Sequence, residues 1–176
     1  MKAIIALLGL TILTGCSTFA TSRYSPSVDN VLALKQHKGV QVNVGNFSSF
    51  EPGLSVITCR GFGPVKSPDG EPYSEYIRKA LTDELKMSDV YSSDAPITLT
   101  GQLNQLDFSS NSGNWNISLT VNSSNGKSVT VNDNYKYTTS YNGETACNQT
   151  AQAFMPAVQD IIAKLVRGND FKTLIK

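Results

Sequence analysis

The stretch "GNWNISLTVNSSNGKSVTVNDNYKY", residues 113–137, decides the fold class. Apolar residues alternate with polar ones on both sides of Asn125-Gly126. Such alternation predicts strands with one buried face, and Asn-Gly is a strong signal for a tight turn between two of them. Residues 97–108 alternate as well, but their apolar positions change parity near Asn104-Gln105, which a β-bulge would explain. We therefore expect a three-stranded antiparallel meander.

Helical patterns flank this meander. Residues 73–87 and residues 147–165 each place their apolar side chains on one helical stripe, and Pro156 is expected to kink the second helix. Shorter signals predict a helix after Ser27 and strands at residues 40–44 and 54–59. The simplest arrangement is an α+β fold, a two-layer sandwich in which two helices pack on one face of a mainly antiparallel sheet.

Residues 59–73, "CRGFGPVKSPDGEPY", are so rich in glycine and proline that we expect a loop without regular structure. Arg60, Phe62 and Lys66 place charge and an aromatic ring on this proline-stiffened frame, which makes them a candidate partner-binding surface. The alternative is that the loop only carries Cys59 and connects a strand to a helix.

The amino-terminal end has the parts of a secretory signal. Lys2 supplies positive charge, residues 3–13 are apolar, and small residues follow them. The apolar run is too short to span a bilayer. Residues 1–15 are therefore expected to be a signal peptide that is removed.

Residues 13–16, "LTGC", resemble the lipobox of bacterial lipoproteins. In that family the signal is cleaved before the cysteine, which receives diacylglycerol and a further acyl chain such as palmitate. The resemblance implies that Cys16 is the lipid-bearing first residue, that residues 16–37 form a tether with a short helix, and that residues 38–176 form one periplasmic domain. Ser17, where an aspartate would retain the protein at the inner membrane, implies the outer membrane. The alternative is an ordinary cleavage region with an incidental Cys16.

Cys59 and Cys147 would then lie in an oxidising compartment, where an isolated pair is most simply a disulfide. The closed loop of about 89 residues corresponds to about 4.6 kcal/mol of stabilisation on the chain-entropy estimate. The alternative is two separate buried thiols. No histidine lies near either cysteine in the sequence, so we expect no metal.

Charge and motifs argue against several functions. The chain has 15 Lys and Arg against 14 Asp and Glu, and residues 1–15 contain Lys2 but no acidic residue. The mature chain is formally neutral, whereas binding to nucleic acid or to an anionic lipid surface as a main partner calls for a basic excess. His37 lies among lysines and is expected to be solvated, as are Asp83 and Glu84 on a polar helix face. Without a nucleophile, metal or phosphate motif, we expect no enzyme and no cofactor.

The order of elements is similar to that of small proteobacterial lipoproteins, namely YajG-like lipoproteins, the auxiliary lipoproteins of ABC-type lipid transport systems, and uncharacterised lipoproteins with the same two cysteines. The shared segments are "YSEYIRKALTDELKMSDVYS", "GQLNQLDFSS…GNWNISLTV" and "ACNQTAQAFMPAVQDIIAKLV…FKTLI". The resemblance implies a membrane-anchored accessory subunit in envelope transport or assembly, with an envelope protein as its partner. The alternatives are a carrier whose pocket, lined by Trp115, Tyr137 and Phe154, holds a lipid or another small ligand, and a cell-wall glycan hydrolase that uses two carboxylates.

Overall fold

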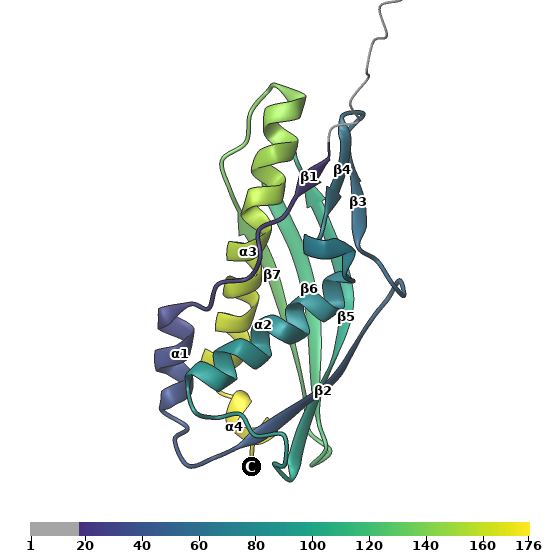
Figure 1. Ribbon diagram of the computed structural model, residues 1–176. Helices are drawn as coiled ribbons and strands as arrows, with labels where there is room; N and C mark the ends of the chain where they lie inside the picture. Colours follow the sequence, from purple (N-terminus) through teal and green to yellow (C-terminus); the bar gives the residue numbers. More distant parts are fainter. Residues whose placement is uncertain (1–17) are drawn as a thin grey trace, which may run out of the picture.

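The computed structural model describes residues 18–176, so Cys16 and the expected signal peptide lie outside the described residues. Figure 1 labels the elements. The strands are β1 (Phe19–Ala20), β2 (Val42–Ser49), β3 (Val56–Cys59), β4 (Gly63–Lys66), β5 (Ile97–Ser109), β6 (Asn114–Ser123) and β7 (Ser128–Lys136). The helices are α1 (Val28–Lys35), α2 (Tyr73–Met87), α3 (Gly143–Arg167) and α4 (Phe171–Leu174), with a 3₁₀ turn at Pro68–Gly70.

The main sheet has the strand order β2-β5-β6-β7 and contains the expected meander. β5, β6 and β7 pair antiparallel, and Gly126 turns the chain between β6 and β7 with a φ of 86°. The register between β5 and β6 shifts between Leu103 and Gln105, which leaves Asn104 as the extra residue. The hairpin and the bulge predicted from the sequence are both confirmed.

The prediction of a mainly antiparallel sheet is wrong, although the α+β class is confirmed. β2 pairs with β5 in parallel, and a smaller sheet of order β1-β4-β3 contains a parallel β1–β4 pair. The reason for the β2–β5 pairing is the crossover between the two strands. α2 carries the chain back across the sheet, so the next strand runs in the same direction as β2.

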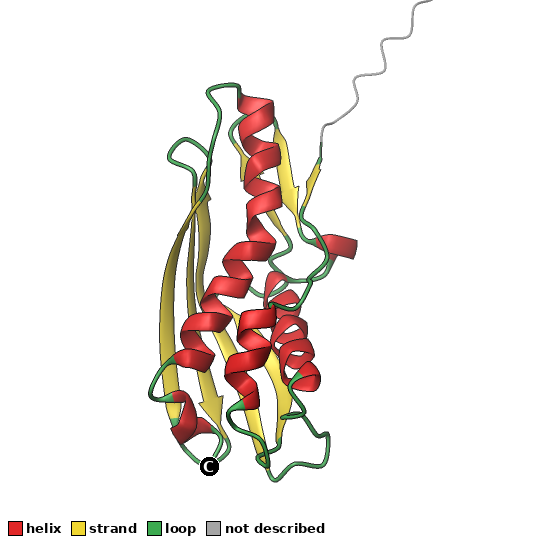
Figure 2. Ribbon diagram, turned by 90° about the vertical axis from the view of Figure 1, so that its left-hand side faces the viewer, coloured by secondary structure: helices red, strands yellow, loops and turns green. Residues whose placement is uncertain are grey.

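The helices form one layer that covers one face of the main sheet (Figure 2). α2 and α3 contact the strands, as predicted, while α1 lies against α2 and α3 and α4 adjoins the end of α3. α1 confirms the short helix predicted after Ser27, whereas α4 is a helix that we did not expect. Phe171 and Leu174 of α4 are fully buried, which confirms the predicted docking of the carboxyl-terminal segment. α3 continues through Pro156.

Aromatic rings fill the space between α2, α3 and the sheet. The ring centroid of Phe154 lies 5.0 Å from that of Tyr73 and 4.9 Å from that of Trp115, and all three side chains are fully buried. The indole of Trp115 donates a hydrogen bond to the carbonyl of Thr150 over 2.9 Å. The hydroxyls of Thr150 and Tyr137 form a hydrogen bond over 2.7 Å. Trp115 and Phe154, two of the residues expected to line a carrier pocket, therefore pack against each other in the core, and the third, Tyr137, is hydrogen-bonded to Thr150.

The opposite face of the sheet is polar, as the alternation predicts. Asn104 donates to the hydroxyl of Thr120 over 2.8 Å, and Thr120 pairs with Thr130 across β6 and β7. At the β7 edge, Asp133 points inward and its carboxylate lies 2.6 Å from the ammonium of Lys164. Burial raises the pKa of Asp133 although Lys164 opposes that shift. An inward-facing charge of this kind protects an edge strand from pairing with another chain.

Between residues 18 and 176, no helix combines the length and the apolar character that crossing a bilayer requires.

Candidate functional site

The predicted disulfide is present and joins β3 to α3. Cys59 and Cys147 are bonded over 2.05 Å, are 88 residues apart in sequence, and are both fully buried. The prediction that residues 59–73 lack regular structure is wrong, because Gly63–Lys66 form β4 between β1 and β3. Pro64 can lie in this strand because β1 pairs only with the two residues that follow it.

The three predicted binding-loop residues do not form one patch. The guanidinium of Arg60 donates to the hydroxyl and to the carbonyl of Ser110, each over 2.9 Å, so it ties the β3–β4 turn to the β5–β6 turn. The Phe62 ring is 51% exposed and lies directly over Gly143, where a Cβ atom would overlap it. Lys66 lies at the far end of β4 and pairs with Ala20. Only Arg60 and Phe62 share an end of the molecule.

Residues 18–27, which the sequence analysis placed in the tether, pack on the domain. We call them the N-terminal segment. After β1, the Tyr76 hydroxyl donates to the carbonyl of Ser22 over 2.9 Å, and the Gln159 amide donates to the carbonyl of Ser25 over 2.7 Å. The segment therefore runs along α2 and α3 before it enters α1 (Figure 1).

Glu84 fastens this segment and is not solvated, contrary to our expectation. Its carboxylate is fully buried and accepts hydrogen bonds from the Tyr24 hydroxyl over 2.5 Å and from the backbone N–H of Ser27 over 2.9 Å. Burial first, and then the hydrogen bond to Glu84, raise the pKa of Tyr24 well above its usual value. Tyr24 therefore remains a donor over the whole physiological pH range.

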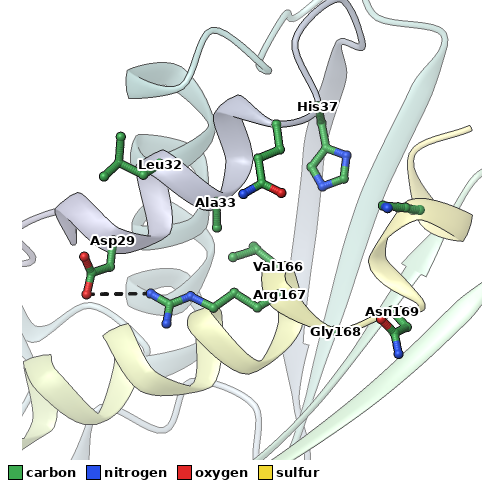
Figure 3. Close-up of a pocket in the computed structure, with 10 residues that line it drawn as sticks. Asp29, Leu32, Ala33, His37, Val166, Arg167, Gly168 and Asn169 are labelled. Carbon is green, nitrogen blue, oxygen red and sulfur yellow. Dashed lines mark ion pairs between the residues drawn. The ribbon is translucent and has the colours of Figure 1, made fainter.

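A groove that the sequence analysis did not anticipate lies between α1 and the end of α3. It has a volume of about 620 Å³. We call it the α1–α3 groove, and Figure 3 shows its lining. It is lined by Asp29, Leu32, Ala33, Gln36, His37, Val166, Arg167, Gly168, Asn169 and Lys172.

Arg167 provides an accessible positive charge in this groove. Its guanidinium lies 3.9 Å from the Asp29 carboxylate and donates to the side-chain carbonyl of Asn30 over 3.3 Å. The two charged side chains are 50% and 79% exposed, and such a pair contributes about 0–1 kcal/mol. A stronger external acceptor can therefore compete with Asp29 for Arg167.

Apolar side chains lie beside this charge. Leu32 is 56% exposed and Val28, one helical turn earlier on the same face of α1, is 73% exposed. The groove therefore offers both an apolar contact and a cation to a partner.

His37 adjoins the same groove and is half-buried, so the prediction that it is simply solvated is wrong. Its ring packs edge-on against Phe171, with the ring centroids 5.4 Å apart. Burial lowers the pKa of His37, and the positive charges of Lys172 and Lys176 lower it further. Burial and the two lysines thus both disfavour the protonated form of the His37 ring.

The positive charges and the exposed apolar side chains of the α1–α3 groove suit recognition of an acidic group.

Within the part of the chain that the structure describes, no cluster of three or more His, Cys, Asp or Glu side chains could hold a metal ion. The lining residues come from both ends of the chain, since α1 lies near the start of the domain and Arg167 and Lys172 lie near its end. This separation is why no local motif indicated the site.

The comparisons with known proteins show a likeness in structure and none in sequence. No family model matches the chain. No curated protein matches it in sequence either. The crystal structure of protein XCC0632 from Xanthomonas campestris, assigned to the family DUF330, is similar with a TM-score of 0.50 and 10% sequence identity, over 89% of this chain and 99% of that one. The chain thus shares its fold with a small proteobacterial protein.

Proposed function

We propose that the protein is a lipid-anchored periplasmic lipoprotein that acts as a non-enzymatic accessory subunit in envelope transport or assembly. The acyl chains on Cys16 would hold the domain at the outer membrane and raise its local concentration for partners there. The α1–α3 groove is the surface that binds the partner. The resemblance to auxiliary lipoproteins of ABC-type lipid transport systems makes a lipid transporter the first system in which to look for that partner.

The observation that supports this proposal most is the composition of the groove. Arg167 and Lys172 provide positive charge, and Leu32 provides an exposed apolar contact. Apolar side chains beside guanidinium groups are typical of the centre of protein interfaces, whereas exposed lysines contribute mainly to steering. The partner is therefore expected to present an acidic and partly apolar surface.

The position of the groove supports the same proposal. The first turn of α3 lies beside the β3–β4 turn and Thr18, and the helix ends at Arg167 in the groove. The ribbon shows α3 running along the length of the molecule between these two ends (Figures 1 and 2). α3 has 25 residues and therefore spans about 37 Å at 1.5 Å per residue. A chain anchored just before residue 18 would present the groove away from the membrane, where an envelope protein can reach it.

Site-specific photocrosslinking in the native bacterium tests this function. A photoreactive amino acid at Leu32 is expected to give one discrete adduct of higher mass. The same amino acid at Thr130, which is exposed on the polar face of the sheet, is the matched control and is expected to give none. The adduct at position 32 should be lost when Arg167→Glu and Lys172→Glu are combined, because these changes reverse the charge of the groove.

Two outcomes contradict the proposal. One is the absence of any adduct at position 32 in cells that contain the protein at its native level. The other is an adduct at position 32 that persists when the charge of the groove is reversed, since the groove chemistry would then play no part in binding.

A further inference from the structure

We infer that the end of the domain formed by the β3–β4 turn, the β5–β6 turn and the start of α3 rests directly on a lipid bilayer, with Phe62 and Tyr141 in the interfacial layer. We call this surface the disulfide end, because the Cys59–Cys147 bond lies beneath it. This inference rests on the proposed attachment at Cys16. The inference adds a second contact with the membrane, which side chains of the folded domain make.

The pairing of β1 fixes where the chain enters the domain. Phe19 pairs with Val65 and Ala20 pairs with Lys66, in parallel. β4 runs away from the β3–β4 turn, so β1 does the same, and Thr18 must lie on the side of that turn. Thr18 also lines a shallow depression with Glu144, in the first turn of α3. The entry point therefore lies on the disulfide end (Figure 1).

The distance from Cys16 to the folded domain is short. Phe19 is 7% exposed, so the chain is packed on the domain from that residue onward. Three residue steps separate Cys16 from Phe19 and can span at most about 10 Å. The polar interfacial layer on each side of a bilayer is itself about 5–8 Å thick. A domain attached so closely cannot stand clear of the surface.

The side chains at this end suit that layer. Phe62 is half-exposed and Tyr141 is fully exposed. The aromatic rings of membrane proteins gather at the interfacial layer. Across residues 59–63, 109–114 and 137–145, only Arg60 and Glu144 are charged, with opposite signs. Two donors of Arg60 are already bonded to Ser110, so part of the hydrogen bonding that its guanidinium needs is met without water.

The three turns are held together as one surface. Arg60 bridges the β3–β4 turn to Ser110, and the hydroxyl of Thr139 donates to the carbonyl of the same serine over 2.5 Å. The N–H of Tyr137 donates to the carbonyl of Gly113 over 2.8 Å. Phe62 lies on Gly143, two residues after Tyr141. Both aromatic rings are therefore displayed from a fixed frame.

A chemical attachment separates this inference from the question of natural lipidation. Cys59 and Cys147 are joined, so in the chain from Cys16 onward the Cys16 thiol is free to react with a maleimide phospholipid in vesicles. One further tryptophan is then introduced into each of three variants, as Phe62→Trp, as Tyr141→Trp and, for the control in the α1–α3 groove, as Leu32→Trp. Quenching by brominated phospholipids measures their contact with the bilayer, after subtraction of the buried Trp115 signal from the unsubstituted chain.

We expect the reporters at positions 62 and 141 to lose emission to the brominated lipids and to shift to shorter wavelength, whereas the reporter at position 32 does neither. Equal quenching at all three positions, or none at positions 62 and 141, overturns the inference. Tyr141 is fully exposed, so that variant should fold even if the larger ring at position 62 disturbs Gly143. Because the attachment is chemical, absence of natural lipidation would overturn the proposed function and leave this result unchanged.

Discussion

Glu84 shows how far a single residue can depart from its sequence pattern. It lies on α2 next to the exposed Asp83, and the sequence pattern predicts that both side chains lie on the polar face of this helix. In the structure Glu84 is fully buried and accepts hydrogen bonds from Tyr24 and Ser27. A burial of this kind depends on a segment about 60 residues away in the chain, so periodicity within α2 could not indicate it.

We expect Glu84→Gln to lower the free energy of unfolding by about 1–3 kcal/mol, because a neutral amide oxygen accepts the bonds to Oε1 less strongly than a carboxylate does, and the amide NH₂ would be buried where Oε2 has no hydrogen-bond partner. Hydrogen exchange should become faster at the amides of residues 19–30. The matched control is Asp83→Asn on the exposed face of the same helix, which should change stability by no more than about 0.5 kcal/mol. Equal losses in both variants, measured by urea denaturation, would show that Glu84 does not fasten the N-terminal segment.

His37 permits a test of the positive field in the α1–α3 groove, since it is the single histidine of the chain. Its pKa is lowered by burial and then by Lys172 and Lys176, so NMR titration should place it below the usual value of about 6.5. Lys172→Gln should move it upward. A pKa at or above the usual value, or one insensitive to Lys172, would contradict the described electrostatics.

The lowered pKa of His37 makes both the stability of the fold and the binding of a partner depend on pH. The folded state binds a proton on His37 less readily than the unfolded state does, so stability is lost as the pH falls below about 6.5. An acidic partner bound in the groove would favour the protonated ring. Its affinity should therefore increase as the pH is lowered through this range.

At the scale of elements, local patterns predicted the strands of the meander, its bulge at Asn104 and the faces of both long helices. Those features depend on neighbouring residues alone. The parallel pairing of β2 with β5 was missed although a helix lies between them, because the apolar signal of β2 is short and the sheet was judged from the meander. β4 was missed because glycine and proline obscure a strand whose pairing comes from β1 and β3.

The disulfide connects two of these elements and confirms the pairing expected from the cysteine count. Replacing both cysteines by Ala should lower the free energy of unfolding by about 2–5 kcal/mol. Chemical denaturation of the oxidised chain, the reduced chain and the double variant measures this. The reduced chain should behave like the double variant, and a reduced chain as stable as the oxidised one would contradict the expected contribution.

At the scale of the whole molecule, the two ends differ in chemistry. The disulfide end carries Phe62 and Tyr141 with little net charge, and the other end carries the α1–α3 groove with Arg167 and Lys172. α3 runs between them for about 37 Å. The sequence indicated Arg60 and Phe62 at the disulfide end as part of a candidate partner-binding surface, but it did not indicate Tyr141. It did not indicate the groove, whose lining comes from segments more than 100 residues apart.

The proposed acylation at Cys16 would place one end of the domain at a membrane and present the α1–α3 groove away from it. Growth of the native bacterium with a clickable palmitate, followed by purification of the protein and of its Cys16→Ala variant, measures this directly. We expect label on the native chain, none on the variant, and a mature chain that begins at residue 16. Equal labelling of the two proteins, or an unlabelled native chain that retains residues 1–15, would contradict the account.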